Sequence, residues 1–186
     1  LTTPQGRSIM PEDHPLALGL CGIYTNKVAA KIYDEADLIM TIGSRMEAFQ
    51  SVTFRFFPQR AKFVQVDIEP QSIGLNWVPD IAIAGDADFV LRDLVAGIGE
   101  KIRKEGRLGD SSRTREIVKA KEEYEAELES DVRLEAIPVN PRRLAIELDR
   151  VFGKDTILCN ENGNNDIWTY IFPYYKVRDL WSTVPM

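Results

Sequence analysis

Histidine and cysteine are scarce in this chain: its 186 residues include one histidine and two cysteines. Cys21 and Cys159 lie far apart in apolar segments, which excludes the disulfide framework of a small secreted domain. We therefore expect reduced thiols and a cytoplasmic protein. His14 precedes Pro15 in a loop, where the local sequence supplies no partner for proton transfer. The sequence thus assigns no catalytic residue and no metal ligand.

An excess of positive charge and long apolar runs are also absent. The 23 Lys and Arg residues are outnumbered by 29 Asp and Glu residues, which gives a net charge of −6 and a pI near 5.0. A nucleic-acid-binding surface would be basic, so nucleic acid is not an expected partner. A membrane helix needs about 20 consecutive apolar residues, and no segment approaches that length, so no membrane partner is expected.

Three short apolar segments are each followed directly by a glycine or an acidic residue. Residues 37–42, 63–66 and 81–84 have the composition of buried β-strands. They are followed, respectively, by Gly43-Ser44-Arg45, by Asp67-Ile68 and by Gly85-Asp86. In a parallel sheet the ligand lies outside the carboxyl ends of the strands, where an acid commonly binds ribose hydroxyls. Asp67 and Asp86 are therefore candidate nucleotide-binding residues.

The same side chains also have structural interpretations. An acid after a strand often caps a turn or the following helix, and in that case no ligand is needed. Arg45 can donate two parallel hydrogen bonds to a phosphate, or it can pair with a nearby carboxylate of the protein. The sequence leaves both alternatives open for each residue.

The remaining patterns predict helices and a division into domains. Capping residues at Asn26, Asp86 and Asn140 indicate helix starts, and the charged segment 112–129 predicts a solvated helix. The aromatic segment 53–58 is predicted to pack beneath the sheet. The fold class is α/β, with a Rossmann-like parallel sheet. The expected parts are a domain over residues 1–104, a charged helical linker over 105–139 and the start of a second α/β domain over 140–186.

Four segments in a fixed order carry a family resemblance. They are Gly6-Arg7 with residues 11–15 (PEDHP), residues 36–45, residues 66–86, and Asn140-Pro141-Arg142 with the loop 161–168. Together they resemble thiamine-diphosphate-dependent enzymes related to acetolactate synthase. The resemblance implies the central Rossmann-like domain of that family without its first strands, followed by a truncated diphosphate-binding domain.

The resemblance also implies chemistry for the longer parent protein. It implies thiamine diphosphate and Mg²⁺ as cofactors, a small-molecule substrate, and carboligation or decarboxylation of 2-keto acids or related acyl donors. The cofactor carries such chemistry as an electron sink. The domain with the activating glutamate and the downstream metal-binding segment of the family are absent from this sequence, so we expect the chain alone to be inactive.

Nine cofactor-binding candidates follow from matching the family motifs to this sequence. In some members of the family the matching central-domain positions surround FAD or ADP, while other members keep the domain without a nucleotide; the later positions contact the diphosphate. FAD is disfavoured because residues 22–26 and Phe49 depart from the pattern of FAD-binding relatives, which leaves ADP or an empty site open. The candidates are Gly43, Arg45, Asp67, Ile68, Gly85 and Asp86 in the central domain, and Gly163, Asn164 and Asn165 in the diphosphate loop.

An alternative interpretation is a stand-alone Rossmann-like nucleotide-binding module with no catalysis of its own. In either case a sheet that lacks its first strands has an unprotected edge. We therefore expect self-association into a homo-oligomer.

Overall fold

The computed structural model of the chain describes residues 1–7, 9–54, 57, 60–106, 111–132, 137–152, 157–160 and 179–182. The chain divides into two compact units. One comprises residues Leu1–Ile32 with Thr114–Met186, and the other comprises Tyr33–Arg113. The domain boundaries expected from the sequence stay a prediction.

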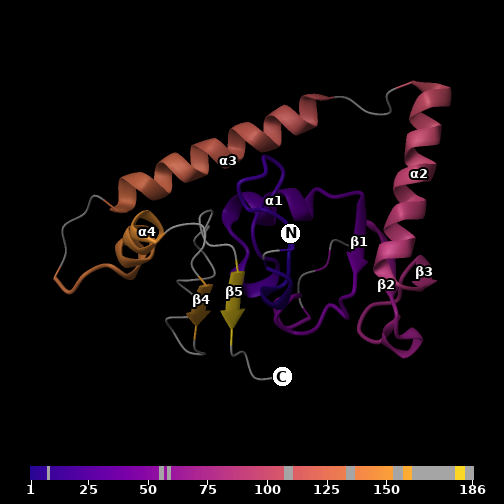
Figure 1. The fold of residues 1–186 in the computed structure, drawn as a ribbon, viewed down its shortest axis with the longest axis horizontal. Coiled ribbons are helices and arrows are strands. Elements are labelled where there is room, and N and C mark those ends of the chain that lie inside the picture. Colours follow the sequence, from indigo (N-terminus) through magenta and orange to yellow (C-terminus); the bar gives the residue numbers. More distant parts are fainter. Residues whose placement is uncertain are drawn as a thin grey trace. The chain divides into compact units, whose positions relative to one another are not determined.

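The unit formed by Tyr33–Arg113 is built on a three-stranded parallel sheet (Figure 1). Its strands are β1 (Leu38–Ile42), β2 (Lys62–Asp67) and β3 (Ile81–Ala84), in the spatial order β1-β2-β3. The predicted α/β class with a parallel sheet is therefore confirmed, because all three strands form where the sequence placed them.

The middle strand β2 is buried on both faces. Phe63, Val64, Gln65 and Val66 are all buried, as expected for a strand with neighbours on both sides and cover on both faces. Side chains alternate along a strand, so Phe63 and Gln65 share one face and Val64 and Val66 the other. The exception to the apolar pattern is Gln65, which is 2% exposed.

Aromatic side chains cover the Phe63 face of the sheet. Phe57 stacks on Trp77 with ring centroids 4.9 Å apart and meets Phe63 edge-on at the same distance. Tyr33, near the end of the preceding helix, contacts Phe57 at 6.5 Å. The predicted packing of the segment 53–58 beneath the sheet is confirmed for Phe57, whereas Phe54 is exposed.

Helix α2 (Ala87–Glu105) follows β3 directly, and Asp86 caps it. The Asp86 carboxylate accepts a hydrogen bond of 2.8 Å from the backbone N–H of Asp88. The helix ends at Gly106, whose φ of 81° lies in the left-handed region that favours glycine. Local sequence therefore sets both ends of α2.

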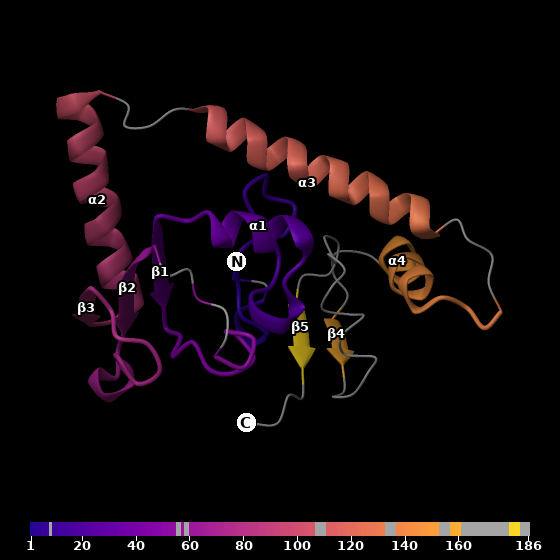
Figure 2. The same ribbon diagram turned by 180° about the vertical axis from the view of Figure 1, so that it is seen from behind.

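The other unit contains most of the remaining elements, which Figure 2 shows from behind. Asn26 starts α1 by accepting a 2.8 Å hydrogen bond from the backbone N–H of Ala29, and Asn140 starts α4 in the same way. None of the helices in the described part of the chain is long and apolar enough to cross a membrane. The elements are α1 (Lys27–Asp34), α3 (Ser111–Val132), α4 (Pro141–Val151) and the parallel pair β4 (Ile157–Asn160) and β5 (Asp179–Ser182).

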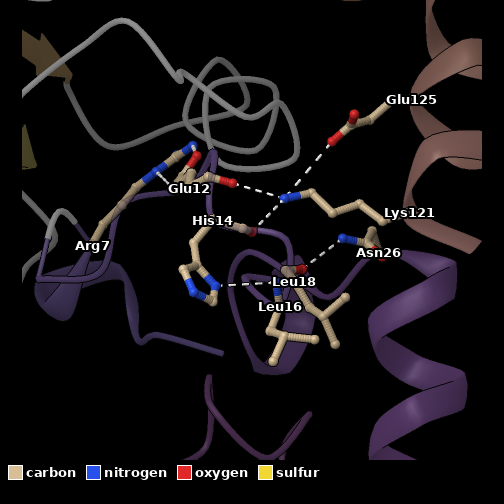
Figure 3. Close-up of polar contacts among 8 residues, drawn as sticks. All are labelled: Arg7, Glu12, His14, Leu16, Leu18, Asn26, Lys121 and Glu125. Atoms are coloured by element: carbon tan, nitrogen blue, oxygen red, sulfur yellow. Dashed lines mark hydrogen bonds and ion pairs between the residues drawn. The ribbon is translucent and has the colours of Figure 1, made fainter. Parts of the chain in front are cut away.

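The sequence predicted a solvated helix for the charged segment 112–129, and the structure adds a specific polar contact of α3. Figure 3 shows Lys121 reaching from α3 into the N-terminal loop, where its ammonium group donates to the carbonyl oxygens of Glu12 and His14 at 2.8 and 3.0 Å. Burial lowers the pKa of Lys121, and the negative charges of Glu125 and Glu12 oppose that shift. Charge content alone did not reveal this contact, because the long aliphatic stem of lysine can be buried while its ammonium group bonds to backbone.

The Asp80 side chain connects the residue before β3 to the start of β2 by hydrogen bonds. Its carboxylate accepts hydrogen bonds from the backbone N–H of Phe63 at 2.8 Å and from the ammonium group of Lys62 at 2.9 Å. These hydrogen bonds stabilise the ionised carboxylate and hold the pKa of Asp80 below its usual value. The bond from the Phe63 N–H has the larger effect, and the bond from Lys62 has the next largest. Asp80 fixes the amino-terminal edge of the sheet, opposite the edge at which the candidate site lies.

We predict that Asp80→Asn lowers the urea midpoint of unfolding at pH 7. A carboxyl whose pKa is depressed in the folded state stabilises it above the unfolded pKa of about 3.9, and that contribution is lost as the pH falls through the folded value. The difference between variant and parent should therefore shrink as the pH falls below about 3.9. Asp93→Asn, on the exposed side of α2, is the control. A difference that persists in acid would contradict the assignment.

Candidate functional site

Six of the nine predicted site residues lie at one edge of the sheet. The strand register pairs Ile42 with Val66 and Asp67 with Ala84, so the carboxyl ends of the three strands lie side by side. This arrangement brings the segments after β1, β2 and β3 together, as expected for a parallel sheet. The residues at this edge are Gly43, Arg45, Asp67, Ile68, Gly85 and Asp86; the other three candidates, Gly163, Asn164 and Asn165, lie outside the described residues.

Both acids at this edge have a local structural role. Asp67 Oδ1 accepts a 2.9 Å hydrogen bond from the backbone N–H of Glu69, and so closes the turn after β2. Asp86 uses Oδ1 in the same way to cap α2. The structural interpretation is therefore confirmed for Asp67 and Asp86, since one oxygen of each carboxylate accepts a local backbone hydrogen bond. Their role in binding a nucleotide stays a prediction.

Arg45 adopts the second of its two predicted alternatives. Its guanidinium lies 2.7 Å from the carboxylate of Glu47, and both side chains are about half exposed. An exposed pair of this kind is worth little, between about 0 and 1 kcal/mol. Among the described residues, this weak contact with Glu47 is the side-chain interaction that a phosphate approaching Arg45 would replace.

The two glycines at the edge are explained by backbone geometry. Gly43 has a φ of 63°, a conformation in which a side chain is strained, and its N–H donates to the carbonyl oxygen of Val66 at 2.9 Å. A Cβ at Gly85 would lie 3.2 Å from Cγ2 of Val90, so this glycine permits close packing of α2 against the strand end. The Gly85 N–H donates to the carbonyl oxygen of Asp67 at 3.0 Å. Both N–H groups therefore extend the sheet.

The sequence analysis missed Gln65, the residue that organises this edge. The Gln65 side-chain amide donates to the carbonyl oxygens of Ser44 and Ser72, each at 3.2 Å, and accepts from the backbone N–H of Gly74 at 2.9 Å. It therefore ties the loop after β1 to the loop after β2. The available signal was a single polar residue inside an otherwise apolar central strand, since a buried amide must find partners.

A second amide supports the same two loops. The Asn76 side chain donates a 2.8 Å hydrogen bond to the carbonyl oxygen of Arg45. With the contacts of Gln65, it places the backbone of residues 44–45 against residues 72–76. The positions of Arg45 and Asp67 are therefore set by a bonded framework and not by loose loops.

The loop that leads away from β1 carries backbone strain. Met46, Val52, Thr53 and Phe54 have φ values of 50°, 50°, 58° and 60°, which non-glycine residues rarely adopt. The buried Ser51 hydroxyl supports the turn, since it donates to the carbonyl oxygen of Glu47 at 2.8 Å and accepts from the Phe54 N–H at 3.2 Å. Strained backbone often accompanies binding sites, and here it follows the strand end that carries Gly43 and Arg45.

Metal binding has no support in the described part of the chain. No group of three or more His, Cys, Asp or Glu side chains there is arranged to hold a metal ion. The segment that the family resemblance assigns to the diphosphate lies in residues 161–168, outside the described residues. The site that the structure describes is therefore the carboxyl edge of the central sheet.

Comparison with known families and proteins identifies this framework. The family model described as "Thiamine pyrophosphate enzyme, central domain" matches residues 1–94, which include all three strands and their carboxyl ends. The chain belongs to the thiamine pyrophosphate enzyme family. The resemblance derived from the sequence is therefore confirmed, as is the Rossmann-like α/β class of its central domain.

Curated relatives from three organisms carry different activity names. A probable acetolactate synthase large subunit of Methanocaldococcus jannaschii is 33% identical over 90% of this chain and 28% of its own length. Glyoxylate carboligase of Escherichia coli O157:H7 is 27% identical over 90% of this chain and 28% of its own length. Sulfoacetaldehyde acetyltransferase of Roseovarius nubinhibens is 25% identical, covering 92% and 31%. The chain thus spans about three-tenths of the length of these three relatives.

We predict that Gln65→Leu lowers the free energy of unfolding by about 3 kcal/mol, because three backbone groups lose a buried partner at about 1 kcal/mol or more each. Urea unfolding monitored by circular dichroism measures the change. Gln71→Leu, at an exposed glutamine of the same unit, is the matched control and should stay within about 0.5 kcal/mol. Equal effects of the two substitutions would contradict the role of Gln65.

Gln65→Glu adds a pH-dependent test of the same contacts. The introduced carboxyl can donate to one of the two carbonyls only when protonated, and burial also raises its folded pKa above the unfolded value of about 4.3. The loss in free energy of unfolding, relative to the parent chain, should therefore be small below pH ~4 and should grow as the pH rises toward the folded pKa. If the loss in free energy of unfolding did not change with pH, the side chain introduced by Gln65→Glu would not occupy the buried position of Gln65.

Proposed function

We propose that this chain is the central part of a thiamine-diphosphate-dependent enzyme that acts on 2-keto acids or related acyl donors. The family match over residues 1–94 carries the proposal. The names of the relatives support the reaction class, since they include a synthase, a carboligase and an acetyltransferase. Carboligation or decarboxylation at an acyl carbon is a reaction class that agrees both with these enzyme names and with the chemistry of thiamine diphosphate.

The described residues contribute a scaffold to that chemistry. When bound with Mg²⁺, thiamine diphosphate would supply the electron sink that reactions at an acyl carbon require. The residues proposed to contact its diphosphate, Gly163, Asn164 and Asn165, lie outside the described part of the chain. We therefore assign the residues of the sheet edge to binding and assembly and none of them to a catalytic step.

The sheet edge suits an adenine nucleotide. One oxygen of Asp67 closes the turn after β2, and the other can accept a hydrogen bond from a ribose hydroxyl. Arg45 is half exposed on a neighbouring loop and can bind phosphate in place of Glu47. ADP matches both groups. FAD is disfavoured by the loop of residues 22–26, which differs from that of FAD-binding relatives.

The activity is tested on the complete polypeptide that contains this segment. With thiamine diphosphate, Mg²⁺ and a panel of 2-keto acids that includes pyruvate and glyoxylate, we expect carbon dioxide release or a new carbon–carbon bond that depends on the cofactor. The 186-residue chain assayed in parallel should show neither reaction. Activity of the complete protein without added or bound thiamine diphosphate would overturn the proposal.

The nucleotide site is tested separately on the 186-residue chain. ADP at about 100 times its dissociation constant should add about 2.7 kcal/mol to the free energy of unfolding in a thermal-shift titration. Asp67→Asn keeps the turn oxygen but loses the charge, and should weaken ADP binding about tenfold or more. Asp93→Asn should leave it unchanged. Equal stabilisation of all three chains by ADP would remove Asp67 from the site.

A further inference from the structure

The strained turn that follows Arg45 begins at Met46. Met46 has a φ of 50°, in the left-handed region, and its side chain is buried with 5% exposed. Its backbone N–H donates to the hydroxyl oxygen of Ser44 at 3.3 Å. The Asn76 side chain donates to the carbonyl oxygen of Arg45. These contacts together fix the direction in which the backbone leaves Arg45.

The backbone of Glu47, the next residue, is also held in place. Its carbonyl oxygen accepts hydrogen bonds from the N–H and from the hydroxyl of Ser51, at 3.0 and 2.8 Å. Ser51 is fully buried, with 0% exposed, and its hydroxyl oxygen also accepts from the Phe54 N–H at 3.2 Å. The carboxylate that contacts Arg45 is therefore carried on an ordered backbone, which reduces the entropy that is lost when the contact forms.

The stability of the ion pair does not account for the strain of this turn. Arg45 and Glu47 are 52% and 50% exposed, and a left-handed backbone costs a non-glycine residue more free energy than such an exposed pair contributes. Three more left-handed residues, Val52, Thr53 and Phe54, follow in the same turn. Strained backbone is concentrated at binding sites and switch regions. The geometry that this turn produces is an acid placed against the arginine of the proposed phosphate site.

We propose that Glu47 regulates the nucleotide site as an internal competitor of phosphate at Arg45. The inference rests on the proposed binding of ADP through Arg45 and Asp67. The Glu47 carboxylate lies 2.7 Å from the guanidinium, at the distance at which a phosphate oxygen would bond. An incoming phosphate must replace the carboxylate, which then keeps its negative charge close to the bound phosphate. Both effects lower the affinity for ADP, while the exposed pair is weak enough to open when the nucleotide binds.

Titration of the 186-residue chain with ADP in a calorimeter tests the competition. Glu47→Gln keeps the size of the side chain without its charge, and should tighten ADP binding about two- to fivefold. Glu105→Gln, at an exposed acid in the last turn of α2, removes the same charge and should leave the affinity unchanged. If parent and Glu47→Gln bind ADP equally, the inference fails and the nucleotide site stands. If none of the chains binds ADP, the nucleotide site and the inference both fail.

A double-mutant cycle separates competition at Arg45 from general charge repulsion. In a chain that already carries Arg45→Gln, the substitution Glu47→Gln has no ion pair to release. It should then change the ADP affinity by less than about twofold, because the two residues act through their mutual contact. The same gain in affinity with and without Arg45 would mean that Glu47 repels ADP from a distance, which would contradict the proposed competition.

Ser51→Ala tests whether the turn holds Glu47 against Arg45. The substitution removes the hydroxyl that donates to the Glu47 carbonyl oxygen and leaves both charges in place. ADP binding should therefore tighten, by a smaller factor than with Glu47→Gln. Ser130→Ala is the matched control, because it removes a similar hydroxyl bond to the carbonyl oxygen of Glu127 in α3, and it should leave the affinity unchanged. Equal ADP affinities of the parent chain and Ser51→Ala would show that the turn does not hold Glu47 in its competing position.

Discussion

The candidate site depends on one buried amide. Gln65 lies in the middle strand, where a polar side chain is tolerated only if its donors and acceptor are bonded. Its partners are the backbone groups of Ser44, Ser72 and Gly74, in the two loops that leave the neighbouring strands β1 and β2. The shape of the carboxyl edge is thus set from inside the sheet, and Arg45 and Asp67 take their positions from it.

The residues at that edge combine structure with binding capacity. Asp67 and Asp86 each use one carboxylate oxygen to close a turn or cap a helix, while Gly43 and Gly85 continue the hydrogen bonding of the sheet. A carboxylate has two oxygens, so the structural role leaves acceptor capacity for a ligand. This accounts for a motif that serves both as turn chemistry and, in our proposal, as part of a nucleotide site.

Helices α2 and α3 show why composition is a weak guide to contacts. The strongly charged α3 buries the stem of Lys121 and bonds its ammonium group to two backbone carbonyls, so a charged helix makes a specific contact within its unit. The more apolar α2 leaves four large aliphatic side chains exposed along one face, namely Leu91, Val95, Ile98 and Ile102. Whether a helix face is buried depends on what lies opposite it, which local composition does not encode.

The sequence alone determined the features that depend on neighbouring residues. Periodicity gave the three strands of the central sheet, the capping residues Asn26, Asp86 and Asn140 gave helix starts, and motif order gave the family. These signals are local because a strand, a cap or a turn is stabilised within a few residues. Only the tertiary structure decided that Gln65 bonds to two loops and that Lys121 reaches the N-terminal loop. The partners of these side chains are backbone groups brought near by folding, and backbone groups have no sequence signature.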